Sequence, residues 1–186
     1  MGRLIYSALT SLDGYIEDEH GRIEWGRPSE EVASAVNELQ STVGTYLYGR
    51  KMYEVMSYWE DSPTDGASPA ELAFTHLWRN AEKIVFSRTL TDVSIRRAEL
   101  RRELDPEWLK HLVTTSERDV SLGGAQLAGD VLRAGLVDEI HLFVEPVTIG
   151  GGLRWSPAGW NDGLDLLASR SFPDGTVLLR YATRRR

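Results

Sequence analysis

Residues 120–152 constrain the fold most, because their pattern is that of a strand, a helix and a second strand in succession. Residues 120–122 are apolar and end at Gly123-Gly124. The helix that follows has one apolar face, formed by Leu127, Ala128, Val131 and Leu132. After Gly135, residues 140–145 alternate between the two faces of a strand. The stretch therefore predicts a βαβ unit, which is the building block of a parallel sheet.

Gly123 and Gly124 lie between the predicted strand and helix. Glycines let the backbone come close to a ligand, and the free N–H groups and dipole of a helix start favour an anion. A nucleotide phosphate is the natural candidate for this position. The alternative is that the two glycines only form a tight turn, and a single Gly-Gly pair before a helix does not decide between the two.

The length and hydropathy of the chain indicate one domain, spanning residues 1–186. No apolar run is long enough to cross a bilayer, and the first residues lack the charged, apolar and small segments of a signal peptide. We therefore expect a soluble cytoplasmic protein that does not act at a membrane.

Composition argues against several classes of site. The chain has no cysteine, and its four histidines do not stand at metal-ligand spacings, so we expect no metal site. A net charge of −7 argues against a nucleic-acid partner, because phosphate contacts need clustered Lys and Arg. We interpret the basic tail Arg184-Arg185-Arg186 as a solvated end.

The rest of the chain continues the alternation of strands and helices. Strands are predicted at residues 3–10, 15–16, 46–48 and 83–86 and around Val93 and Ile95, and helices from Pro28 through Val43, from Arg50, over 70–81 and from Pro106. Residues after Gly152 are expected to be irregular until a hairpin of 164–172 and 176–181. We expect an α/β fold with a mostly parallel central sheet, helices on both faces and a C-terminal antiparallel hairpin.

Polar residues follow several of these strands, at the edge where α/β sheets bind ligands. Asp13 follows the first strand; it either faces the ligand or only caps a turn before Gly14, and the spacing alone favours the turn. Gly49, Arg50 and Lys51 follow another strand, where two cations suit a phosphate, although a solvated basic pair is the alternative.

Four further residues, in three segments, are candidates for ligand contact. Ser87 and Arg88 end a third strand and could meet a phosphate or a ribose. Trp25 lies in a loop near the end of the first strand, where it either fills the core or forms a pocket wall. Glu30 suits the dipole of a helix start, and the same place also suits a carboxylate that faces a cleft.

Taken together in order, these motifs resemble the dihydrofolate-reductase-like proteins. The motifs are SLDG at 11–14, YGRKMYE at 48–54, VFSR at 85–88, SLGGAQLAGDVLRAGLVDEIHLFVEPV at 121–147 and IGGG at 149–152. The nearest likeness is to stand-alone homologues of the reductase domain of the bifunctional riboflavin-biosynthesis deaminase-reductase. The resemblance covers nearly the whole chain and implies a dihydrofolate-reductase-like three-layer fold.

The resemblance also implies NADPH, bound across the carboxyl ends of the strands. Residues 49–51 would lie by the adenosine phosphates, and Ser87 and Arg88 near the adenine ribose and its 2′-phosphate. Gly123, Gly124, Ala125 and Gln126 would hold the pyrophosphate. Two positive groups at one end favour NADPH over NADH, because the extra phosphate needs pairing.

For the substrate side, the resemblance implies a cleft tryptophan, Trp25, and a catalytic acid, Glu30, with Asp13 beside the cleft. We expect an NADPH-dependent reductase that transfers a hydride to a C=N or C=O group of a pterin-like or pyrimidine-like molecule. The alternatives are the riboflavin-pathway reductase acting on 5-amino-6-(ribosylamino)uracil phosphate and a non-catalytic NADP-binding module. The family likeness also suggests a homodimer, with the segment 155–160 as a possible subunit contact.

Overall fold

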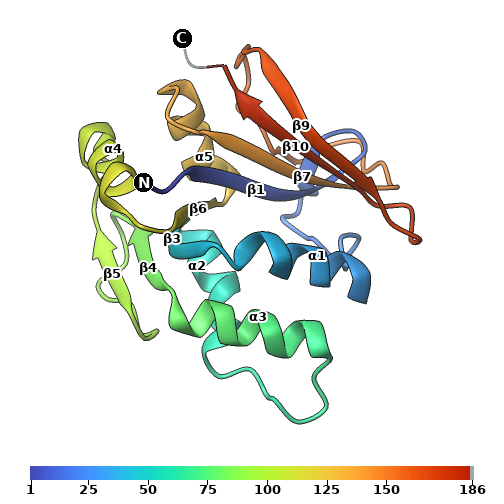
Figure 1. Ribbon diagram of the computed structural model, residues 1–186, viewed down its shortest axis with the longest axis horizontal. Helices are drawn as coiled ribbons and strands as arrows, with labels where there is room; N and C mark the ends of the chain where they lie inside the picture. Colours follow the sequence, from blue (N-terminus) through green and yellow to red (C-terminus); the bar gives the residue numbers. More distant parts are fainter. Residues whose placement is uncertain (185–186) are drawn as a thin grey trace.

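The computed structural model describes residues 1–184 and is built on an eight-stranded sheet in the order β5-β4-β3-β6-β1-β7-β10-β9 (Figure 1). Six strands are parallel to one another: β1 (Leu4–Ser11), β3 (Val43–Gly49), β4 (Glu82–Phe86), β5 (Ala98–Arg101), β6 (Asp119–Gly123) and β7 (Glu139–Glu145). The hairpin of β9 (Leu164–Ser171) and β10 (Val177–Thr183) adds an antiparallel edge against β7. The predicted fold class is confirmed. Arg185 and Arg186, from the tail interpreted as solvated, lie outside the described residues.

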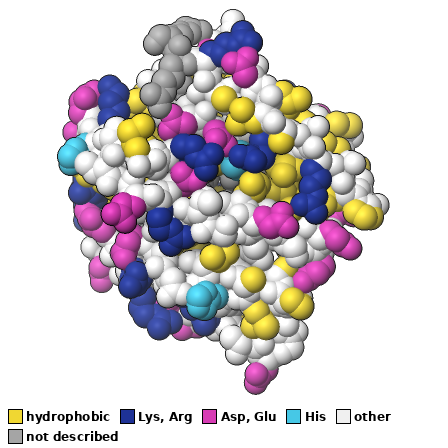
Figure 2. Space-filling view, viewed as in Figure 1, with side chains coloured by type: hydrophobic (Ala, Val, Ile, Leu, Met, Phe, Trp, Pro, Cys, Tyr) yellow, Lys and Arg dark blue, Asp and Glu magenta, His cyan; other side chains and the backbone are white. Residues whose placement is uncertain are grey.

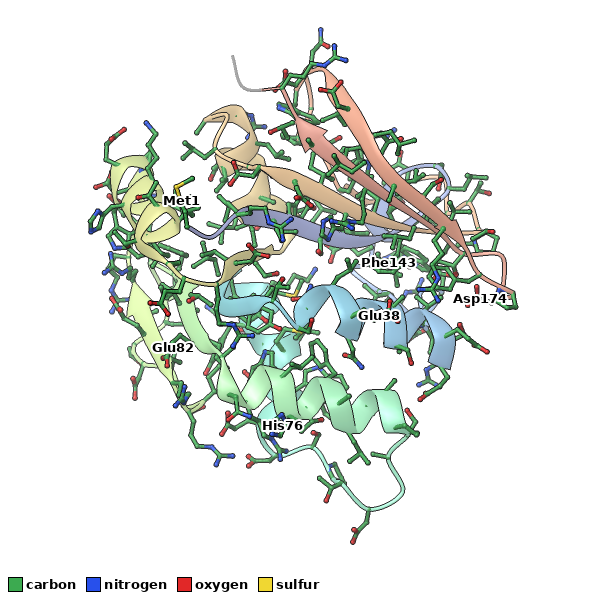
Figure 3. All side chains as sticks on the ribbon, viewed as in Figure 1. Met1, Glu38, His76, Glu82, Phe143 and Asp174 are labelled. Carbon is green, nitrogen blue, oxygen red and sulfur yellow. The ribbon has the colours of Figure 1, made fainter. Side chains whose placement is uncertain are left out.

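Helices cover both faces of the sheet. The helices are α1 (Glu30–Gln40), α2 (Arg50–Met56), the short η1 (Ser57–Glu60), α3 (Pro69–Asn80), α4 (Pro106–Thr115) and α5 (Ala125–Arg133). Helices α1 and α3 lie side by side (Figure 1). Phe143 of β7 lies beside α1, where it packs with Val32 and Ala35 (Figure 3). Alternate residues of the same strand, Ile140 and Leu142, belong to a different core cluster that includes residues of α4 and α5. The two faces predicted for this strand thus pack into two separate core clusters.

Three strand ends meet at one rim of the sheet. Gly49 of β3 is in register with Phe86 of β4, and Tyr48 of β3 is in register with Gly123 of β6. Because the three strands are parallel neighbours, the residues after them leave the sheet side by side. The separate sequence motifs at these positions therefore form one continuous edge.

The segment 155–160, predicted as a possible subunit contact, has its aromatic residues packed within the chain. The rings of Trp155 and Trp160 meet edge to face with centroids 6.0 Å apart. The hydroxyl of Tyr6 donates to the carbonyl of Trp155 at 2.8 Å. Both tryptophans are partly buried against the core cluster that includes residues of α4 and α5.

Three predicted boundaries were wrong. Val43 does not continue the helix: α1 ends at Gln40, and Val43 begins β3, where it is buried. No strand forms at Val93 and Ile95, because the edge strand is Ala98–Arg101. Residues after Gly152 were expected to be irregular, yet β8 (Leu153–Arg154) pairs with β2 (Tyr15–Glu17) in a small second sheet.

Among residues 1–184, no helix is both long enough and apolar enough to span a membrane. On the face shown in Figure 2, acidic and basic side chains are interspersed.

Candidate functional site

A cleft of about 730 Å³ opens where β1 and β6 separate. The two strands pair only from Leu4 to Tyr6 on β1, whereas β1 continues alongside β7 as far as Ser11. The stretch of β1 that does not pair with β6 lines the cleft, together with the first residues of α2 and α5 and parts of the loop that follows β2. The lining residues are Tyr6, Ser7, Ala8, Leu9, Ile16, Glu17, Gly21, Ile23, Trp25, Gly26, Gly49, Arg50, Lys51, Met52, Glu54, Val55, Gly124, Ala125, Gln126, Leu127 and Leu153.

The start of α5 forms one wall of the cleft and has no side-chain cap. Its N-cap is Gly124, at φ +93°. The caps of α1, α3 and α4 are instead Ser29, Ser68 and Asp105, each of which accepts a backbone hydrogen bond. Uncapped N–H groups at a helix start can bind an anion. Of the residues predicted here, Gly124, Ala125 and Gln126 line the cleft, and Gly123 lies directly behind them in β6.

Gly123 is required by packing. A Cβ at this position would come within 2.9 Å of the Tyr48 ring and 3.3 Å of the Met52 Cγ. The Tyr48 ring is held in place, because its hydroxyl accepts a hydrogen bond from the buried indole N–H of Trp78 and its face stacks on Tyr46. The glycine therefore allows β6 to reach the rim at the level of β3.

Gly49, Arg50 and Lys51 line the opposite wall, at the start of α2. The Arg50 guanidinium is half exposed and bonds to Glu54 at 2.7 Å and to the Thr89 hydroxyl at 2.9 Å. The Lys51 ammonium bonds to Glu17, across the cleft, at 2.6 Å. Both cations thus lie at the rim in exposed ion pairs, which cost little to rearrange.

Ser87 and Arg88 follow β4 near this wall but do not line the cleft. The Ser87 hydroxyl accepts hydrogen bonds from the backbone N–H groups of Thr89 and Leu90, so it stabilises the turn after β4. Arg88 is exposed and pairs with Glu103. The turn extends the rim beyond Arg50, to which Thr89 bonds directly.

Asp13 lies outside the cleft lining and holds two loops together. Its carboxylate accepts hydrogen bonds from the Ser11 hydroxyl at 2.6 Å and from the backbone N–H groups of Ile149 and Gly150. The Ser11 and backbone hydrogen bonds lower the pKa of this carboxyl. The structure therefore gives Asp13 the turn-stabilising position that the sequence spacing favoured.

Trp25 forms a wall of the cleft, whereas Glu30 lies away from it. The Trp25 indole nitrogen is buried and has no hydrogen-bond partner among the described residues. Glu30 is exposed, and its carboxylate accepts the backbone N–H of Ala70 at 2.8 Å, in the first turn of α3. The structure therefore places the Glu30 carboxylate at the start of α3 and outside the residues that line the cleft.

Sequence reasoning missed several residues of the site. Tyr6 and Ser7 line the cleft from the middle of β1. They were missed because the apolar run of a central strand does not show that the neighbouring strand β6 pairs with it only as far as Tyr6. Leu153 reaches the cleft through the small second sheet. Arg102 donates to the Ser87 carbonyl at 3.1 Å and was missed because the edge strand that precedes it was predicted too early.

A protein-family model described as the RibD C-terminal domain matches residues 3–178 of this chain. A curated relative is the uncharacterized protein YyaP of Bacillus subtilis, which is 27% identical over 181 residues that cover 96% of this chain and 94% of YyaP.

Two solved structures are similar in fold. A putative riboflavin biosynthesis protein from Shewanella sp. PV-4 aligns with a TM-score of 0.77 at 19% identity, over 98% of this chain and 99% of that one. Dihydrofolate reductase from Enterococcus faecalis, solved as a complex with NADP(H) and RAB-propyl, aligns with a TM-score of 0.63 at 15% identity, over 98% of this chain and 97% of that one. At such identities the likeness shows a shared fold.

Proposed function

Because this chain belongs to the RibD C-terminal domain family, as its motifs predicted, we propose that it is an NADPH-dependent reductase. The proposed substrate is a pterin-like or pyrimidine-like molecule with a reducible C=N or C=O group. The observation that carries the proposal is the shared rim of β3, β4 and β6, with an uncapped helix start and two cations beside a deep cleft. This arrangement can bind a phosphorylated nucleotide next to a smaller, apolar pocket.

The residues of the rim fit NADPH. The N–H groups at Gly124, Ala125 and Gln126 would hold the pyrophosphate, since no side chain of residues 1–184 caps this helix start. Arg50 and Lys51 would bind phosphate oxygens with the N–H groups that their carboxylate partners Glu54 and Glu17 leave free. When bound, the reduced nicotinamide supplies the hydride, and the protein contributes position and electrostatics.

The cleft also fits a flat, largely apolar substrate. Beyond the cofactor rim its walls include Leu9, Ile23, Trp25 and Leu153. The cleft volume of about 730 Å³ is that of a small-molecule site, which typically has about 300–1,000 Å³. Glu30 is not part of this pocket, so the proposed function does not use it as an acid.

The proposal is tested by following the absorbance of reduced nicotinamide while the protein is incubated with NADPH and candidate substrates. The candidates are 7,8-dihydropterin, 7,8-dihydrofolate and 5-amino-6-(ribosylamino)uracil phosphate. Turnover of any of them supports a reductase, and turnover of the last alone supports the riboflavin-pathway step. NADPH affinity without turnover supports the non-catalytic binding module, and absence of NADPH binding would overturn all three.

A matched pair of variants separates a cofactor effect from general damage. Gly124 and Gly135 lie at opposite ends of α5, and both have positive φ, at +93° and +66°. Alanine strains the backbone at either position by about 1–3 kcal/mol, and more at Gly124, whose ψ of 122° lies outside the left-handed helical region. Only Gly124 lines the cleft, so Gly124→Ala should weaken NADPH binding about tenfold or more, and Gly135→Ala should leave it unchanged.

A further inference from the structure

Ser7 has an unpaired, buried hydroxyl beneath the floor of the cleft. It lies on the stretch of β1 that β6 no longer covers, and it lines the cleft. Its Oγ atom is buried and has no hydrogen-bond partner among residues 1–184. Buried hydroxyls are nearly always hydrogen-bonded, so an unpaired one in a ligand cleft indicates a ligand contact.

His141 lies behind Ser7 on the neighbouring strand. The two residues are in register between β1 and β7, so their side chains leave the same face of the sheet. His141 is only 2% exposed, and its Nδ1 atom also has no partner among the described residues. Two unpaired polar atoms thus belong to paired residues of neighbouring strands, and they do not hydrogen-bond to each other in the structure without a ligand.

The tautomer of His141 follows from its other nitrogen. Nε2 lies 2.9 Å from Oε2 of Glu139, to which Arg180 also donates at 3.1 Å, whereas Arg3 donates to Oε1 at 2.6 Å. The Arg180 Nε lies farther from the imidazole Nε2, at 3.4 Å. An ionised carboxylate can only accept and is the nearer of the two neighbours, so Nε2 carries the proton. Burial lowers the pKa of His141, which leaves the ring neutral near pH 7. Nδ1 then has a lone pair and can accept a hydrogen bond.

The remaining polar groups of the cleft complete the pattern. Both carboxylates that line it are already paired, Glu17 with Lys51 and Glu54 with Arg50. The indole N–H of Trp25 is an unpaired donor. A ligand beyond the cofactor rim therefore finds one donor, the Trp25 indole N–H, and one pair of polar groups that can accept, Ser7 and His141 behind it. Among the described residues it finds no free carboxylate.

We propose that Ser7 contacts the substrate and that His141 positions the Ser7 hydroxyl; this inference rests on the proposed function for the place of the substrate. In the complex, a ring N–H of the substrate donates to Ser7 Oγ, and the Ser7 hydroxyl, which is unpaired in the structure, turns to donate to Nδ1 of His141. The Trp25 indole donates to a carbonyl of the same ring. The site selects a neutral ring that carries N–H and C=O groups over a protonated amidine, which needs a free carboxylate.

The test uses uracil and 2,4-diaminopyrimidine as probes of the two edge types. Each is titrated into ¹⁵N-labelled protein loaded with NADP⁺, and the side-chain nitrogens of His141 and Trp25 are followed by NMR. Uracil should shift the His141 Nδ1 and Trp25 Nε1 signals in a saturable way and should bind more tightly than 2,4-diaminopyrimidine. The His141 signal reports the hydrogen bond itself, which a purely structural residue would not change.

Ser7→Ala should weaken uracil binding about tenfold, since losing one hydrogen bond to a buried partner has that order of effect. Ser121→Ala is the matched control, because Ser121 is a buried serine of β6 that does not line the cleft. It should change uracil affinity less than twofold. His141→Gln, which keeps a donor and an acceptor, should retain more affinity than His141→Leu.

The proposal is overturned if uracil fails to bind, if it leaves the His141 and Trp25 signals in place, or if Ser7→Ala and Ser121→Ala behave alike. Tighter binding of 2,4-diaminopyrimidine would equally overturn it. If the chain does not bind NADP⁺, the proposed function fails, and the same titration on the free protein still decides whether Ser7 contacts a ligand.

Discussion

Replacing Gly123 by alanine should destabilise the protein through a single steric contact. The added Cβ would lie 2.9 and 3.0 Å from two Tyr48 ring carbons and 3.3 Å from the Met52 Cγ. Tyr48 cannot move aside easily, because it is 3% exposed and its hydroxyl is bonded to Trp78. Gly123 is not at positive φ, so the penalty comes from packing and not from the backbone.

The magnitude follows from the cost of overpacking, about 1–3 kcal/mol. Gly49→Ala is the matched control, since it lies at the end of the adjacent strand and its Cβ would meet only Leu127, at 3.8 Å. Both changes reduce the entropy of the unfolded chain by a similar amount, so this contribution cancels in the comparison. We expect Gly123→Ala to be less stable than Gly49→Ala by about 2 kcal/mol.

Urea unfolding followed by circular dichroism measures this difference through the midpoint concentration and the slope. At the size of this chain, about 2 kcal/mol corresponds to a fall in Tm of roughly 4–8 °C. Equal midpoints for the two variants would refute the reasoning, because they would mean that β6 does not approach β3 as closely as the structure shows.

Three further predictions concern other parts of the chain. Glu30→Gln should leave turnover within about twofold of wild type, because the carboxylate bonds to Ala70 outside the cleft; loss of turnover in a steady-state assay would contradict this. Lys51→Ala should weaken NADPH binding about tenfold by calorimetry, because its ammonium would bind phosphate oxygens of the cofactor, and an unchanged affinity would count against that contact. Burial lowers the pKa of His141 below its ordinary 6.5, so the native chain binds fewer protons than the unfolded chain just below that pH. Stability should therefore fall as pH drops from about 6.5 through the folded pKa of His141, and His141→Gln should remove this part of the pH dependence in urea unfolding at a series of pH values.

The strand ends that form the cofactor rim could be predicted from the sequence, because each combines a local apolar run with a residue that interrupts it. Gly49 and Gly123 both follow such runs, and parallel pairing then brings them to one edge. The helix at α5 was equally clear from its single apolar face. The strand ends and this helix depend on residues close together in the sequence, and hydrophobic periodicity detects such local patterns.

Features that depend on pairing between distant segments were missed. Val43 fits the apolar spacing of the preceding helix, yet pairing with β6 makes it the first residue of a strand. The two-residue strand at Leu153–Arg154 exists only because β2 lies beside it. Glu30 matches the spacing of a cleft acid, but the start of α3 offers its carboxylate an unpaired backbone N–H and holds it there. In all three cases the structure of the residue depends on which distant segment lies beside it, and residue spacing in the sequence does not show this.

We propose that the ends of β3 and β6 and the starts of α2 and α5 form one nucleotide site. Mapping backbone amide shifts by NMR during an NADPH titration tests it most directly. We predict that the largest shifts occur at Gly49, Arg50, Gly124 and Gln126, with Gly135, at the far end of α5, unchanged. Shifts centred on Gly135, or no saturable shift at Gly124, would contradict the account.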